Sequence, residues 1–150
     1  PNRANAFQFD TDTHNIFICA DSNRLLSAFL ELLSNAAEAD NSCGSIQIHS
    51  HVNACGHTVT VSVTGKGSLS EINPSEMQTN PLIDADAPLT AQLSTPFFST
   101  KENHAGLGLS IVAQVCHTHH AGFELYSRNG FTTAGITFPI LAMDDMRNTI

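Results

Sequence analysis

Three polar side chains recur at helical spacing in the segment Glu31–Ala39. Glu31, Asn35 and Glu38 stand at positions i, i+4 and i+7, so a helix would place two carboxylates and an amide along one stripe. Such oxygen ligands suit Mg²⁺, which keeps several waters and shares its coordination with substrate phosphates. A neighbouring carboxylate can act as a general base. A solvated helix face has a similar composition, so the stripe alone leaves both interpretations open.

Two glycine-containing segments offer exposed backbone donors. Thr64–Gly67 directly follows an expected strand, where its two glycines permit a close approach of the backbone. Gly106–Val112 opens an expected helix and follows Pro96–Lys101. The N–H groups at a helix start form an anion site, to which Lys101 would add a positive charge. Each segment by itself is equally compatible with a tight turn.

Hydrophobic periodicity predicts the elements that position these segments. Alternating apolar residues indicate strands and helical spacing indicates two helices. The result is an α+β fold, a two-layer sandwich with helices over one face of a mixed β-sheet. The predicted order is strands Ala6–Asp10 and Asn15–Ala20 paired as a hairpin, a helix Asn23–Ala39 capped by Asp21-Ser22, strands Ser45–Val52 and His57–Val63, an irregular segment Thr64–Thr95, a helix Leu107–His119, and strands Phe123–Ser127 and Gly135–Leu141.

Composition narrows the class of protein. The 150 residues are 41% apolar and 13% charged, which suits a single globular domain, residues 1–150. A net charge of −8 disfavours nucleic acid as a partner. The four cysteines form no CxxC pair and are expected to be reduced thiols in the cytoplasm. No apolar run approaches the roughly 20 residues of a membrane span, so direct membrane contact is not expected. The chain is expected to be part of a longer protein, which can carry a membrane anchor.

The histidines allow a second site to be considered. His117, His119 and His120, with Cys116, are candidate ligands of a transition metal. We favour the simpler interpretation, a surface cluster that is favourable near a helix C-terminus. His49 and His51 are predicted to be solvated on one strand face.

Five sequence segments together resemble a known family. ELLSNAAEA (31–39), the Gly65–Gly67 turn, PFFSTK (96–101) and GLGLSIV (106–112) resemble the N box, first glycine box, F box and second glycine box of the histidine-kinase branch of the GHKL ATPases. GITFPI (135–140) resembles the closing strand of that family. The resemblance extends from about Ala6 to Leu141.

The resemblance implies a Bergerat-type ATP site between the helices and the sheet, closed by a lid over about residues 64–100. Asn35 would bind Mg²⁺, and Glu31 would assist catalysis. The γ-phosphoryl group of ATP would pass to a histidine on a separate dimerisation domain, which this chain lacks, and a response regulator would follow. Residues 142–150 are expected to be a frayed tail. The implied nucleotide contacts are Asn35, Val63, Gly65, Gly67, Thr100, Lys101, Gly106, Leu107 and Gly108.

Two positions depart from the family pattern. Val63 stands where the family has an Asp that accepts a hydrogen bond from adenine, and residues 59–70 contain no acid. Losing a hydrogen bond to a charged group, about 1.5–3 kcal/mol, weakens binding by roughly tenfold to a few hundredfold. His104-Ala105 replaces a Gly-Thr pair. Two functions therefore remain: a working kinase domain whose adenine contact is supplied differently, or a degenerate domain that binds ATP weakly or not at all and acts as a signalling module.

Overall fold

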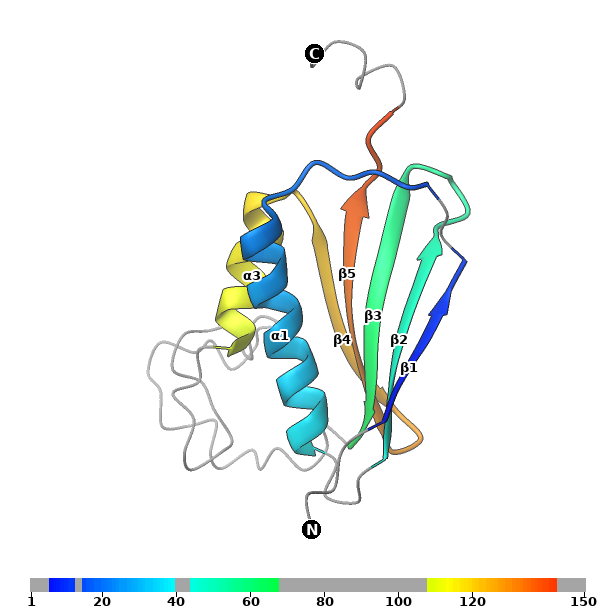
Figure 1. The fold of residues 1–150 in the computed structure, drawn as a ribbon, viewed down its shortest axis with the longest axis vertical. Coiled ribbons are helices and arrows are strands. Elements are labelled where there is room, and N and C mark those ends of the chain that lie inside the picture. The colour runs from blue at the N-terminus through cyan, green and yellow to red at the C-terminus, as the bar shows by residue number, and fades with distance from the viewer. Residues whose placement is uncertain (1–5, 13–14, 40–43, 68–107, 143–150) are drawn as a thin grey trace, which may run out of the picture.

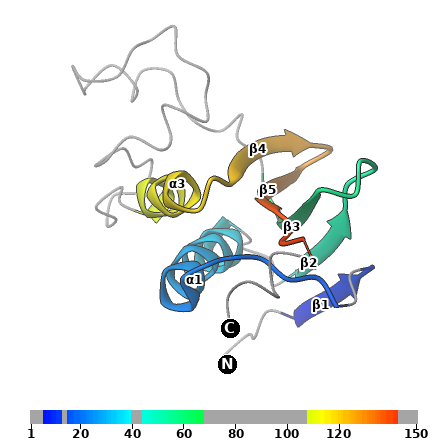
Figure 2. The same ribbon diagram turned by 90° about the horizontal axis from the view of Figure 1, so that it is seen from above.

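The computed structural model describes residues 6–12, 15–39, 44–67 and 108–142. In these ranges the two helices lie side by side on one face of a five-stranded sheet, as Figures 1 and 2 show. The predicted two-layer sandwich is therefore confirmed. The elements are β1 (Ala6–Thr11), α1 (Ser22–Ala39), β2 (Ser45–Val52), β3 (Thr58–Lys66), α3 (Gly108–Thr118), β4 (Gly122–Arg128) and β5 (Phe131–Pro139).

The sheet is mixed, with strand order β1-β2-β3-β5-β4. β1 runs parallel to β2, and the remaining neighbours are antiparallel. In the register, Phe9 lies opposite Ile48, Ile48 opposite Val63, and Val63 opposite Ala134. Residues directly opposite each other share a face, so this row crosses the sheet on the side covered by the helices.

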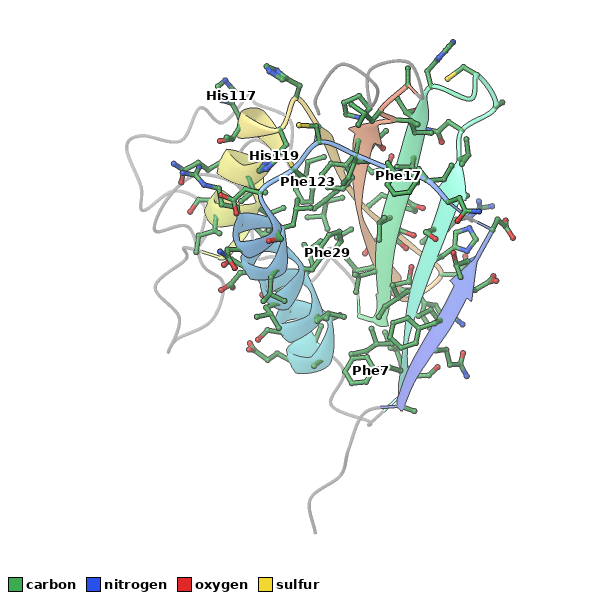
Figure 3. All side chains as sticks on the ribbon, turned by 45° about the horizontal axis from the view of Figure 1, so that its top comes forward. Phe7, Phe17, Phe29, His117, His119 and Phe123 are labelled. Atoms are coloured by element: carbon green, nitrogen blue, oxygen red, sulfur yellow. The ribbon has the colours of Figure 1, made fainter. Side chains whose placement is uncertain are left out.

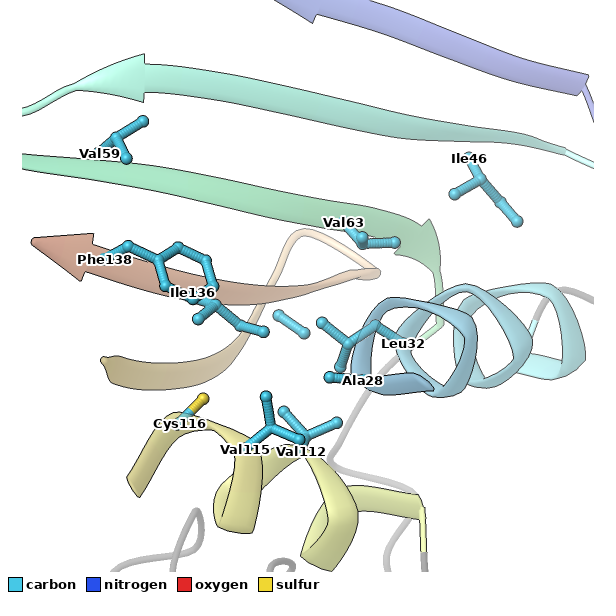
Figure 4. Close-up of a cluster of buried hydrophobic side chains, with 11 residues drawn as sticks. Ala28, Leu32, Ile46, Val59, Val63, Val112, Val115, Cys116, Ile136 and Phe138 are labelled. Carbon is cyan, nitrogen blue, oxygen red and sulfur yellow. The ribbon is translucent and has the colours of Figure 1, made fainter. Parts of the chain in front are cut away.

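The hydrophobic core lies between this face and the two helices (Figure 4). Its largest fully buried side chains are Phe138, Ile46, Ile136 and Val112. The helices cover the sheet unevenly, since Phe7 and Phe9 of β1 point to the helix side yet remain 50% and 74% exposed. The edge of the apolar face therefore extends beyond α1.

Helix α1 begins as predicted. The Oδ1 atom of Asp21 accepts hydrogen bonds from the backbone N–H groups of Asn23 at 2.9 Å and Arg24 at 3.1 Å, which satisfies two of the donors left free at a helix start. The apolar residues that recur at helical spacing in α1 form its buried side: Leu32 is buried, and Leu25, Phe29, Leu33 and Ala36 are half-buried. Ala28, which the periodicity did not single out, is fully buried and lies in the core cluster with residues of α3 (Figure 4).

The predicted strand Asn15–Ala20 is wrong, and so is its hairpin with β1. β1 instead pairs with β2. Asn15 has a left-handed backbone with φ 56°, and the following residues cross over the sheet to reach α1. Ile16 and Ile18 are half-buried while Phe17 and Cys19 are exposed, so this crossing segment alternates in burial without a strand partner. That alternation explains why its sequence resembles a strand.

Strand β3 is longer than predicted, because Thr64, Gly65 and Lys66 continue it. β5 pairs with it as far as the Lys66–Phe131 pair, so these residues are not part of an irregular segment. The chain turns at 53–56, between the two predicted strands, and at 128–130. β5 begins four residues before the predicted strand Gly135–Leu141 and ends two residues before its end. Asn129 and Gly130 both have positive φ, at 54° and 76°, as a two-residue hairpin of the I′ type requires.

Helix α3 ends in a Schellman motif. The N–H of Ala121 donates to the carbonyl of Cys116 at 2.8 Å, and the N–H of His120 donates to that of His117 at 3.4 Å. His120 adopts the left-handed conformation, φ 51°, that this cap requires. The predicted helix 107–119 is confirmed within a residue at its C-terminal end, and Leu107 lies outside the described residues.

Three of the cysteines lie in the described ranges, and all three are free thiols: Cys19, Cys55 and Cys116. Burial raises the pKa of Cys116 to about 11, so its thiol is protonated at neutral pH. The pKa of Cys55 is lowered, chiefly by a hydrogen bond from the backbone of His57. Cys43 lies outside the described residues.

Candidate nucleotide site

The polar stripe of α1 meets the first residue of α3. A Cβ atom added at Gly108 would lie 2.6 Å from Oε2 of Glu31 and 3.7 Å from Nδ2 of Asn35. Both side chains are half-buried. The carboxylate and the amide therefore converge on the helix start that carries the second glycine segment, and the missing side chain of Gly108 provides the space for them.

The start of α3 supplies the complementary charge. The first N–H groups of this 11-residue helix have no partner within the helix, and the helix dipole makes them a favourable place for anions. Beside them lie an oxygen of the Glu31 carboxylate and the amide group of Asn35, and carboxylate and amide oxygens are ligands of the kind that Mg²⁺ binds. The residues of this arrangement thus fit a metal-bound phosphate group.

Glu38, the third member of the stripe, does not join this site. Its carboxylate accepts a hydrogen bond from Oγ of Ser34 at 2.8 Å on an exposed surface. Glu38 lies seven residues beyond Glu31, about 10 Å further along the axis at about 1.5 Å per residue. α3 runs in the opposite direction from α1 (Figure 1), so it extends away from Glu38.

The glycines at the end of β3 allow a close approach to α1. A Cβ atom at Gly65 would lie 2.9 Å from Cβ and 3.1 Å from the carbonyl oxygen of Ala36. Gly67 has φ 148°, and a Cβ there would lie 3.1 Å from Cβ of Ala39. Among the described residues, the partner that Gly65 and Gly67 approach is therefore the helix that carries Asn35.

We expect Gly65→Ala to lower the free energy of unfolding by about 1–3 kcal/mol, the usual cost of overpacking a filled interior. The clashing atoms belong partly to the backbone of α1, which cannot rotate away. Gly122→Ala is the matched control, because its Cβ would contact only Cβ of Thr137 at an ordinary 3.8 Å. Urea denaturation of both variants measures the difference, and equal stability of the two would contradict the tight Gly65–Ala36 contact.

Val63 is a core residue of the sheet. Its side chain is 2% exposed and lies in the core cluster with Leu32 and Ala134 (Figure 4). Gly65 projects to the same face of β3, two residues further on. Neither position supplies a hydrogen-bond acceptor from a side chain, so the wall of the sheet that faces this part of α1 is apolar.

The other predicted site residues, Thr100, Lys101, Gly106 and Leu107, lie outside the described residues, as do His104, residues 68–100 of the predicted lid and residues 143–150 of the predicted tail.

One cavity of about 330 Å³ opens between the first half of α1 and strands β1 to β3. It contains none of the predicted site residues. Its lining is almost wholly apolar, with a hydroxyl pair at one end where Oγ of Ser50 donates to Oγ1 of Thr11 at 2.8 Å. The convergence of Glu31, Asn35 and Gly108 lies outside this hollow.

The histidines are arranged differently from a surface cluster. His117 and His120 are exposed, but His119 is half-buried between the two helices, and both of its ring nitrogens have partners (Figure 3). In the described part of the chain, no three His, Cys, Asp or Glu side chains gather as a metal site. No helix within those same ranges is long and apolar enough to cross a bilayer.

Comparison with known proteins assigns the chain to a family. Residues 20–142 match the family described as "Histidine kinase-, DNA gyrase B-, and HSP90-like ATPase". The chain belongs to this ATPase family. The matched range contains α1, α3 and the site at Glu31, Asn35 and Gly108.

Relatives within the ATPase family are sensor histidine kinases. The chain is 33% identical over 127 residues to the sensory histidine kinase/phosphatase NtrB of Rhizobium leguminosarum bv. phaseoli, covering 81% of this chain and 32% of the relative. It therefore spans about a third of the length of that protein. The catalytic domain of the histidine kinase ThkA, solved free of nucleotide, superposes with a TM-score of 0.68 at 28% identity, over 91% of this chain and 80% of that catalytic-domain chain.

A second ThkA structure contains a response regulator. ThkA in complex with the response regulator protein TrrA superposes on this chain with a TM-score of 0.64 at 26% identity, over 90% of this chain and 34% of ThkA. Together these likenesses show that the fold is that of a histidine kinase catalytic domain.

Proposed function

We propose that this chain binds Mg²⁺–ATP between α1 and α3 and transfers its γ-phosphoryl group to a histidine on a separate dimerisation domain. The observation that carries the proposal is the convergence of Glu31 and Asn35 on Gly108. The kinase relatives and the ThkA–TrrA complex support a response regulator as the next acceptor. The expected setting is the cytoplasm.

Each residue of the site has a role in this proposal. The amide oxygen of Asn35 would hold Mg²⁺, and the N–H groups at the start of α3 would hold phosphate oxygens. Bound Mg²⁺ would neutralise charge on the phosphates. In the transfer, a bond forms between an imidazole nitrogen and the γ-phosphorus, and the bond from that phosphorus to the bridging oxygen breaks, leaving ADP. The carboxylate of Glu31 accepts the proton that the imidazole loses.

The apolar wall at Val63 favours a second candidate function. A nucleotide held mainly by its phosphates binds more weakly than one whose base is also hydrogen-bonded. A chain with this defect can act as a signalling module without catalysing transfer, in the sense of a degenerate kinase domain. In a kinase domain of this kind, discrimination between adenine and guanine would be weak, because neither Val63 nor Gly65 offers the base a side-chain acceptor.

Thermal unfolding with and without nucleotide decides between these functions. A ligand at about 100 times its Kd adds about 2.7 kcal/mol to the free energy of unfolding. For a working kinase domain we expect stabilisation by Mg²⁺–ATP at millimolar concentration, with GTP almost as effective. If millimolar ATP does not shift the unfolding temperature, the proposed nucleotide binding is wrong, and the signalling module is the function that remains.

Val63→Asp tests the missing base contact. We expect the variant to be less stable without ligand, because an ionised carboxylate replaces part of a buried isopropyl group. Val63→Asp should bind ATP about tenfold or more tightly than the natural chain does, whereas its affinity for GTP should not increase. Val59→Asp is the control, since Val59 is also buried on the same face of β3 but further from Asn35. If both variants show the same ATP affinity as the natural chain, Val63 does not face the base.

A further inference from the structure

His119 joins the end of α3 to the start of α1. Its Nδ1 atom lies 2.7 Å from the carbonyl oxygen of Val115, and its Nε2 atom lies 2.9 Å from the backbone nitrogen of Asp21. A carbonyl only accepts and a backbone N–H only donates. The ring is therefore the neutral tautomer with its proton on Nδ1, and Nε2 accepts the hydrogen bond from Asp21.

Asp21 is the residue from which α1 starts, and each of its hydrogen-bonding groups is in use. Its side chain caps the N–H groups of Asn23 and Arg24, and its carbonyl accepts from Leu25 at 3.0 Å. Its own N–H is the donor to His119. A displacement of His119 relative to Asp21 would therefore act on the first turn of α1 as a whole.

The hydrogen bond and the nucleotide site lie at opposite ends of the same helix pair. α1 and α3 run antiparallel, so the start of one lies beside the end of the other (Figure 1). Glu31 is ten residues beyond Asp21, which is about 15 Å along α1 at about 1.5 Å per residue. Gly108 is eleven residues before His119 on α3, a comparable length. The two contacts therefore bracket the interface.

Between these ends the interface is apolar. Ala28 and Leu32 of α1 pack with Val112 and Val115 of α3 in the core cluster (Figure 4). These close-packed side chains resist both separation and sliding of the helices, but they contain no hydrogen-bonding group. A hydrogen bond weakens steeply when its angle departs from linear. The hydrogen bond between His119 and Asp21 is therefore a directional contact that adds to this packing in holding the axial register.

We infer that His119 is a positioning residue for phosphoryl transfer. By fixing the axial register of α1 against α3, it sets where Glu31 and Asn35 stand relative to Gly108. A slide of α1 by one residue would move Glu31 by about 1.5 Å, and a misplacement of about 1 Å can lower a rate about a hundredfold. The inference about rate rests on the proposed function, while the inference about geometry does not.

The first test measures geometry in the 150-residue chain without nucleotide. His119→Phe keeps a ring but removes both nitrogens, and His119→Gln returns an acceptor near the position of Nε2. We expect the amide NMR signals of Gly108 and of the Asn35 side chain to shift in His119→Phe and to return towards their natural positions in His119→Gln. His117→Phe, an exposed change in the last turn of α3, should leave them in place. Unchanged signals in His119→Phe would overturn the inference.

The second test measures rate. In His119→Phe we expect kcat for phosphoryl transfer to fall about tenfold or more, while KM for ATP stays within about threefold, with rescue of kcat in His119→Gln. Equal losses in both His119 variants would refute the acceptor role. If the natural chain transfers no phosphoryl group, the proposed function fails, and the NMR comparison still decides the positioning role.

A third measurement needs no variant and applies even if His119→Phe does not fold. The nitrogen-15 shifts of the His119 ring in the natural chain report its tautomer. We expect protonated Nδ1 and a bare Nε2 that is hydrogen-bonded to the Asp21 amide. A proton on Nε2 alone would contradict the hydrogen bond on which the inference depends.

Discussion

Replacing Glu31 with Gln should slow phosphoryl transfer about 10²–10⁴-fold with little change in the affinity for Mg²⁺–ATP. The amide has nearly the shape of the carboxylate, so the contact with Gly108 is retained. It is too weak a base to accept the proton that the attacking imidazole loses, and positioned bases contribute rate factors of this size. Single-turnover transfer and an ATP titration measure the two quantities separately.

Glu38→Gln is the matched control for this variant. Glu38 lies on the same helix, but it is exposed and bonded to Ser34 rather than directed at α3. Its replacement should leave both transfer and ATP affinity unchanged. If Glu31→Gln transfers phosphoryl groups as fast as the natural chain, or if Glu38→Gln loses as much activity as Glu31→Gln, the proton acceptor is another group.

Gly108→Ala should lower transfer about a hundredfold in a protein that folds normally. The new Cβ would stand 2.6 Å from Oε2 of Glu31, so this carboxylate has to move, and a shift of about 1 Å is enough for such a loss. The variant should still fold, because the new Cβ meets the end of a flexible side chain and Gly108 does not have a positive φ that alanine would find strained. Alanine also favours helix over glycine by about 1 kcal/mol. Denaturation and transfer assays on the same preparation measure both effects.

The cause of that loss can be isolated with a double variant. Glu31→Ala removes the group that the new Cβ displaces. In that background Gly108→Ala should cost little further activity, because residues in contact give non-additive effects. A full hundredfold loss in the Glu31→Ala background would mean that the methyl group blocks the phosphates directly rather than through Glu31.

Elements with local signals were predictable from the sequence. The carboxylate of Asp21 marked the start of α1, and Asn129-Gly130 marked the β4–β5 hairpin, because each signal acts within a few residues. The parallel pairing of β1 with β2 was not predictable, because it joins segments that are separated by a whole helix. The crossing segment was mistaken for a strand because Ile16 and Ile18 alternate in burial without a ladder.

The residues of the site also divide into those that a local sequence pattern predicts and those that it does not. Helical spacing placed Glu31 and Asn35 on one stripe, and the family resemblance placed Gly108 opposite them. Helical spacing alone also grouped Glu38 with these two residues, because the spacing within α1 does not show where α3 begins. The role of His119 had no local signal at all, since its partner Asp21 lies 98 residues away in the chain. Contacts of this kind follow from how the helices pack rather than from any motif.

The central feature of the proposed site is a metal–triphosphate bound between α1 and the start of α3. Mn²⁺ occupies oxygen sites like those of Mg²⁺ and broadens the NMR signals of nearby nuclei. On titration of the chain with ATP and trace Mn²⁺, we predict that the Asn35 side-chain amide and the Gly108 backbone amide broaden first, and that ATP is required for this. Broadening that begins elsewhere, such as at His49 and His51, or that leaves Asn35 and Gly108 sharp with ATP in excess, would contradict the assigned site.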